Sequence, residues 1–178
     1  MAQISLKSLM TNNTPTYPAE AVQPFRDELT DVGFTDLLTP ADVDAALNKQ
    51  DDKSILVVLN SVCGCAAGKA RPGVIVSMLN DTVPDEYVAL FAGMEKEAVN
   101  HFREKYMTGI TPSSPNIALF KNGKLVHLLQ RYQVEGKSAS DIAQDLSAAY
   151  TVNCSKKNST EESTTLKKYI ADKYHVNL

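Results

Sequence analysis

Apolar residues in the first third of the chain change from a helical spacing to an unbroken run. Between residues 22 and 32 they recur every three or four positions, and Gly33 follows, which predicts a helix that ends near this glycine. The stripe consists of Val22, Phe25, Leu29 and Val32. Thr39 precedes a second, short helix that has Pro40 at its first position. The apolar run SILVVLN, residues 54–60, predicts a central strand covered on both faces.

The pattern then alternates between helical and strand segments up to residue 150. A helix that Pro72 should kink follows residue 65, and a strand follows at Tyr87–Phe91. Further segments are a helical stripe from Met94 to Tyr106, strands at Ile117–Phe120 and Leu125–Leu129 joined by Asn122-Gly123, and a helix capped by Ser138. From residue 54 the order is β-α-β-α-β-β-α, with a right-handed crossover in the βαβ unit. This order is that of an α/β, thioredoxin-like fold: a mixed sheet flanked by helices, with an N-terminal helical extension.

Segments at both ends of the chain are poorer in regular patterning than its centre. We expect a loose N-terminus at residues 1–17, the thioredoxin-like domain at 18–154, and a polar linker with a possible short helix at 155–178. The final segment should lie outside the core. Its deletion should therefore leave folding nearly intact.

Composition narrows the possible partners and the cellular compartment. The 178 residues carry a formal net charge of -3, which provides no field to gather nucleic acid or anionic lipid, so neither is an expected partner. No signal-peptide pattern and no long apolar segment is evident, and we expect a soluble cytoplasmic protein. Three cysteines in that compartment do not form a structural disulfide framework, so any pairing among them should be transient or catalytic.

Cys63-Gly64-Cys65 lies directly after the buried strand and before the next helix. Backbone N–H groups and the helix dipole favour anions there, so a thiolate would be stabilised, and the thiolate is the nucleophile in disulfide exchange. A disulfide between Cys63 and Cys65 closes a small ring that Gly64 can accommodate, and strain should make it easily reduced. Two neighbouring cysteines could instead merely pack, or form half of a metal site. The remaining candidate ligands have no recognisable spacing; they are Cys154, His101, His127 and His175.

Other residues near this motif in the predicted fold have two interpretations each. Ser114-Pro115 precedes the third strand, and a cis bond there would present the backbone of Ser114 to an extended substrate. Lys69 and Arg71 could stabilise a thiolate or attract an anionic small thiol, or could be solvated cations on a helix face. Cys154 could resolve or store a disulfide, or be an ordinary thiol.

Three segments together resemble the bacilliredoxins, thioredoxin-like proteins of bacteria. They are SVCGCAAGKARPG, TPSSPNIALFKNGKLVHLLQRYQVEG and VGFTDLLTPADVDAAL, and the resemblance covers about residues 18 to 154. It implies removal of bacillithiol from protein cysteines, or a related disulfide reductase or isomerase activity. On this resemblance Cys63 is the attacking cysteine, Cys65 is the second cysteine, and Pro115 is the proline of the SSP segment.

The sequence therefore predicts a thiol–disulfide oxidoreductase with Cys63 and Cys65 as catalytic residues. Gly64, Ser114 and Pro115 are the predicted substrate-binding residues, and no metal or bound cofactor is expected, a small thiol being the co-substrate. The expected partners are protein mixed disulfides, small thiols and a recycling reductase. The alternatives are a non-catalytic thioredoxin-like binding module and a cysteine-ligated metal or Fe–S carrier.

Overall fold

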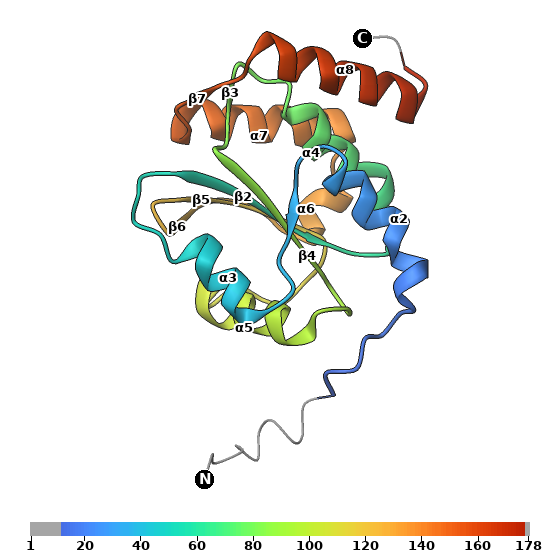
Figure 1. Cartoon of the computed structure of the whole chain (residues 1–178), viewed down its shortest axis with the longest axis vertical. Coiled ribbons are helices and arrows are strands. Elements are labelled where there is room, and N and C mark those ends of the chain that lie inside the picture. The colour runs from blue at the N-terminus through green and yellow to red at the C-terminus, as the bar shows by residue number, and fades with distance from the viewer. Residues whose placement is uncertain (1–11, 177–178) are drawn as a thin grey trace.

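The structure, a computed structural model that describes residues 12–176, is built on a five-stranded mixed sheet (Figure 1). The strand order is β1-β4-β2-β5-β6; β1 and β2 run parallel to β4, whereas β5 runs antiparallel to β2 and to β6. These strands are β1 (Thr35–Asp36), β2 (Ser54–Asn60), β4 (Glu86–Phe91), β5 (Asn116–Lys121) and β6 (Lys124–Leu129). A second, two-stranded sheet pairs β3 (Thr82–Val83) with β7 (Lys156–Lys157).

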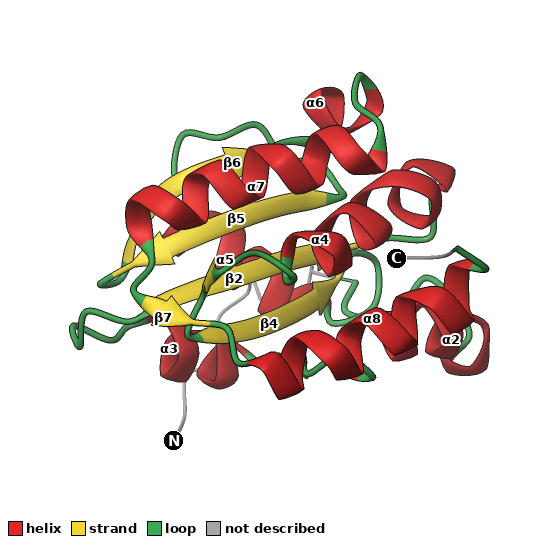
Figure 2. Ribbon diagram, turned by 90° about the horizontal axis from the view of Figure 1, so that it is seen from above, coloured by secondary structure: helices red, strands yellow, loops and turns green. Residues whose placement is uncertain are grey.

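Helices cover both faces of the main sheet and produce three layers (Figure 2). Leu56 and Val58 of β2 face one apolar cluster, and Ile55, Val57 and Leu59 face the other. The first cluster involves α2 (Ala19–Thr30), α4 (Arg71–Ser77), α6 (Arg131–Glu135), α7 (Ala139–Asn153) and α8 (Thr160–Tyr174). The second involves α3 (Pro40–Leu47) and α5 (Lys96–Tyr106). Strand β2 is buried throughout, as the apolar run predicted, and the fold is thioredoxin-like.

The local signals identified in the sequence act as expected. Thr39 and Ser138 both form capping boxes at the starts of α3 and α7. Asn122 and Gly123 adopt φ angles of 51° and 72° in the turn between β5 and β6, the left-handed conformations that this hairpin requires.

The irregularity expected around Pro72 takes the form of a π-helical turn. Residues Ala66–Ala70 form η1, which passes into α4 at Arg71, and the Arg71 N–H bonds the Ala66 carbonyl. Pro72 has no N–H to donate to the preceding turn, so the disturbance falls just before it. Turns of this type are frequent at functional sites, and this one follows the two cysteines directly.

The segment after residue 154 was expected outside the core, and that expectation is wrong. Ser159 caps α8, which begins at Thr160, and Leu166 and Ile170 of this helix are buried in the first apolar cluster. Residues 155–165 are mostly polar because this part of the segment faces solvent. Leu166 and Ile170, two apolar residues one helical turn apart, are enough to anchor α8 on the core.

At the other end of the chain, residues 1–11 lie outside the part that the structure describes. Thr16, within the segment predicted to be loose, donates from its N–H to the Gly93 carbonyl.

Replacing Ile170 with alanine should therefore lower the free energy of unfolding by about 3 kcal/mol, because the side chain is 1% exposed and truncation leaves a cavity. Urea unfolding of the full-length variant measures this change. Val152→Ala is the control, since Val152 is 82% exposed and its truncation should change stability by less than about 0.5 kcal/mol. Equal stability of the two variants would mean that α8 does not pack on the domain in solution.

Among the described residues, no helix combines the length and the apolar character that crossing a membrane requires.

Candidate active site

Cys63 and Cys65 lie where the central strand gives way to a helix. Strand β2 ends at Asn60, helical backbone begins at Gly64, and a disulfide joins the two cysteines, whose Cα atoms are 5.4 Å apart. Both cysteines are half-buried, and Gly64 between them is exposed. The disulfide can therefore be reached from solvent. Gly64 does not adopt a positive φ, and its surroundings leave open space for a Cβ, so the ring closes without the backbone freedom of glycine.

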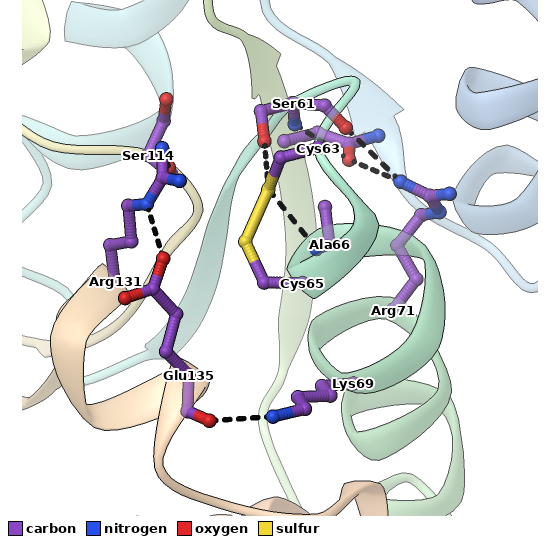
Figure 3. The surroundings of a disulfide bond; sticks show 10 residues. Ser61, Cys63, Cys65, Ala66, Lys69, Arg71, Ser114, Arg131 and Glu135 are labelled. Atoms are coloured by element: carbon purple, nitrogen blue, oxygen red, sulfur yellow. Dashed lines mark hydrogen bonds and ion pairs between the residues drawn. A yellow bond between two sulfur atoms is a disulfide. The ribbon is translucent and has the colours of Figure 1, made fainter.

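The surroundings of the two sulfur atoms differ. The Ser61 hydroxyl lies 3.2 Å from Cys63 Sγ and the Ala66 N–H lies 3.3 Å from the same atom, so both can donate to it (Figure 3). Cys65 instead packs against the first apolar cluster. Hydrogen-bond donors favour the charged form of a sulfur, whereas apolar contacts do not. The arrangement thus favours a thiolate at Cys63 when the disulfide is reduced.

Arg71 proves to be neither a thiolate partner nor a solvated cation, the two interpretations that its sequence position suggested. Its side chain is 1% exposed, and its Nε donates to Glu28 Oε2 of α2 at 2.8 Å. Its Nη1 donates to the Asn60 side-chain oxygen at 3.1 Å and to the Ser61 carbonyl at 3.2 Å. Asn60 in turn accepts the Ser61 N–H at 2.9 Å. Arg71 therefore lies behind the disulfide and fixes the loop that carries Ser61.

The Ser114–Pro115 peptide bond is cis, as predicted. Asn116 pairs with Leu59 in the antiparallel ladder between β5 and β2, so continuing this register places Ser114 beside Ser61, next to the disulfide. Figure 3 shows Ser114 on the side of the disulfide opposite Arg71. All five predicted site residues, Cys63, Gly64, Cys65, Ser114 and Pro115, therefore lie at the same edge of the sheet.

Helix α6 borders the site beside Ser114, and its charged residues Arg131 and Glu135 were not identified from the sequence. Arg131 Nη1 lies 3.4 Å from the Ser114 carbonyl, and Arg131 Nε pairs with Glu135 Oε1 at 2.7 Å. Lys69 donates to the Glu135 carbonyl at 2.5 Å, which directs its charge to α6 and away from the sulfur atoms (Figure 3). Ser61 and Arg131 are polar residues just after predicted strands, a position that would have been the only sequence signal for them. Glu135 ends α6, a short helix that the sequence analysis did not predict.

Cys154 lies far from the other two cysteines. It is buried at the end of α7 beside Ser54, at the opposite end of β2 from Cys63, and a seven-residue strand spans about 23 Å. Burial raises the pKa of the Cys154 thiol, which makes it a poor nucleophile. Cys154 therefore cannot resolve a mixed disulfide at Cys63 in this structure.

The other suggested metal ligands are equally dispersed. His101 Nε2 lies 2.8 Å from Asp44, and His127 Nε2 lies 2.8 Å from Asp145 on the other side of the sheet. Within residues 12–176, no group of three or more histidine, cysteine or acidic side chains could hold a metal ion.

Sequence comparison identifies the relatives of this chain. The sequence model of the family described as "Disulphide isomerase" matches residues 17–154. A bacilliredoxin of Salinibacter ruber is 47% identical over 78% of this chain and 81% of its own, and a bacilliredoxin of Staphylococcus epidermidis is 46% identical over 80% and 99%. Among solved structures, Fasciola hepatica thioredoxin is 19% identical and aligns over 66% of this chain and 99% of its own, with a TM-score of 0.45.

A dithiol at the end of the central strand of a thioredoxin-like sheet, in a chain with these relatives, defines a thiol–disulfide oxidoreductase. The chain belongs to the bacilliredoxin family.

Proposed function

We propose that this protein reduces mixed disulfides between protein cysteines and a low-molecular-weight thiol of the bacillithiol kind. The observation that carries the proposal is the pair of donors, the Ser61 hydroxyl and the Ala66 N–H, directed at Cys63 Sγ. They support Cys63 as the nucleophile of the pair. The bacilliredoxin names of the relatives support the choice of small thiol.

The first step is attack by the Cys63 thiolate on the small-thiol sulfur of the mixed disulfide. A bond forms between Cys63 Sγ and the small thiol, the client S–S bond breaks, and the client cysteine leaves as a thiolate that takes a proton from water. No electrons are gained or lost overall, since one disulfide replaces another.

The second step is attack on Cys63 Sγ by the Cys65 thiolate, which is one residue away. The small thiol leaves with the electron pair of the broken bond, and the Cys63–Cys65 disulfide seen in the structure forms. The client has then been reduced by two electrons and the dithiol oxidised by two. A recycling reductase, or two molecules of small thiol that become a disulfide, returns those electrons.

Substrate binding is proposed for the backbone around the dithiol. The exposed Gly64 backbone and the Ser114 carbonyl border the disulfide, and buried Pro115 fixes the end of β5 beside it. An extended client segment could pair with the Ser114 backbone if it displaced the long contact from Arg131. The proposed chemistry needs no bound cofactor, and we place it in the cytoplasm, where thiols are kept reduced.

Release of the small thiol from a defined client tests the proposal. A client protein with a single cysteine is prepared as its mixed disulfide with bacillithiol, glutathione or coenzyme A, and its intact mass is followed after addition of the reduced protein. We expect bacillithiol to be released faster than the other two. Equal release of all three would contradict the assignment of the small thiol, and release of none would contradict the reductase itself.

A further inference from the structure

A groove of about 940 Å³ lies at the opposite end of the sheet from the dithiol. Strand β1, helix α3 and the start of β4 form one wall, and β7 and α8 form the other. Figure 2 shows α8 on the β4 side of the sheet. The wall from β7 and α8 lies beyond residue 154, where the family match ends, so this groove includes structure added to the family's domain.

The groove concentrates the negative charge of the molecule. Its lining includes seven carboxylates and two lysines, a formal charge of -5, whereas the whole chain carries -3. The chain outside the groove is therefore slightly positive. Low-dielectric walls of one charge sign focus the field and raise the local concentration of cations.

Four of these seven carboxylates form no ion pair with any of residues 12–176. Asp42 accepts backbone N–H groups at the start of α3, and Asp85 accepts the N–H and hydroxyl of Ser54. Asp31, directly after α2, and Glu161 of α8 are both exposed and form no ion pair among residues 12–176. Four carboxylates are thus available to a positively charged ligand.

The floor of the groove is apolar. It is formed by six buried side chains that line the groove, four of them from α3, β3, β4 and α8 and two from the positions directly after β1 and α4: Ala46, Val83, Val88, Leu166, Leu37 and Met78. A ligand that only carried charge would leave this floor covered by water. A ligand with both basic and apolar groups would satisfy the walls and the floor together.

We infer that this groove binds a basic, partly apolar peptide segment of a partner protein. The volume lies at the upper end of the range for small-ligand sites, which suits several residues of extended chain. The carboxylates repel phosphates, nucleic acids and acidic peptides, and a polyamine, whose apolar groups are short methylene chains, would cover less of the floor than leucine and valine side chains. Since the groove and the dithiol lie at opposite ends of the sheet, a bound segment leaves Cys63 accessible and increases the effective concentration of the tethered partner.

Calorimetric titration of the full-length protein with the peptide acetyl-KLKVKLK-amide tests the inference. The comparison ligands are acetyl-ELEVELE-amide, which reverses the charge, and spermine, which lacks apolar side chains. The groove variant is Asp31→Lys with Glu161→Lys. The matched control is Glu104→Lys with Asp172→Lys, which changes the net charge equally at two exposed positions outside the groove.

The basic peptide should bind, and the groove variant should weaken it by about tenfold while the control changes it by less than about twofold. Raising the ionic strength should weaken binding to the wild-type protein, a result independent of whether a variant folds. Absence of binding, equal weakening in both variants, or binding of the acidic peptide would overturn the inference. Spermine binding as tightly as the peptide would also overturn it, in favour of a polyamine site. None of these outcomes depends on disulfide exchange at Cys63.

Discussion

Replacing Cys63 with serine should abolish formation of adducts with the small thiol, whereas replacing Cys65 with serine should leave adduct formation intact and cause adducts to accumulate. The reason is the difference between the two sulfur atoms: Cys63 Sγ faces two hydrogen-bond donors, and Cys65 packs on the apolar cluster. The first cysteine can hold a thiolate that attacks, and the second can only displace the partner already bound to its neighbour.

Intact-mass spectrometry after brief exposure to a mixed-disulfide substrate distinguishes these outcomes. Cys154→Ser serves as the control, because this buried thiol lies at the other end of β2 and its replacement should change neither capture nor turnover. Turnover of Cys65→Ser should return when free small thiol is added, since an external thiol can then resolve the adduct. Capture of substrate by Cys63→Ser but not by Cys65→Ser would reverse the assignment of attacker and resolver.

The sequence predicted the dithiol and its setting because each depends on local signals. The run at 54–60 identified the central strand, and the helical stripe after Cys65 placed the cysteines between strand and helix. The cis bond at Pro115 could be predicted because it follows from the fold type. The assignment of Cys63 as the attacking cysteine rested on the resemblance to the bacilliredoxins, and the hydrogen bonds to its sulfur now support it.

The environment of Arg71 could not be predicted, because it depends on contacts between residues far apart in the sequence. A basic residue on a helix is normally solvated, and nothing local indicates that Glu28, 43 positions earlier, will face it in the interior. The packing of α8 was missed for the same reason. Its composition is that of a solvated segment, and only the apolar surface left by α2, α4 and α7 explains why Leu166 and Ile170 become buried.

Replacing Arg71 with methionine should lower the free energy of unfolding by about 4 kcal/mol, because it leaves the Glu28 carboxylate unpaired in a site where the side chain is only 14% exposed. Combining it with Glu28→Gln removes the unpaired charge and should recover part of that loss. Urea unfolding of the two variants measures the difference. If the double variant is no more stable than the single one, the Glu28–Arg71 pair does not form in solution.

The same pair of variants also tests whether Arg71 positions the site or only supports the fold. Arg71 holds the carbonyl of Ser61, and the Ser61 hydroxyl donates to Cys63 Sγ. Loss of a hydrogen-bond donor disfavours the thiolate form of Cys63. The pH at which the rate of Cys63 alkylation reaches half its maximum should therefore be higher in Ser61→Ala than in the wild-type protein. Below that midpoint alkylation should slow by about tenfold, the equivalent of one charge-assisted hydrogen bond, and at high pH the rates should converge with wild type. The Arg71→Met, Glu28→Gln double variant should show an upward shift as well, although it recovers part of the lost stability. A wild-type midpoint in that variant would mean that Arg71 supports the fold alone.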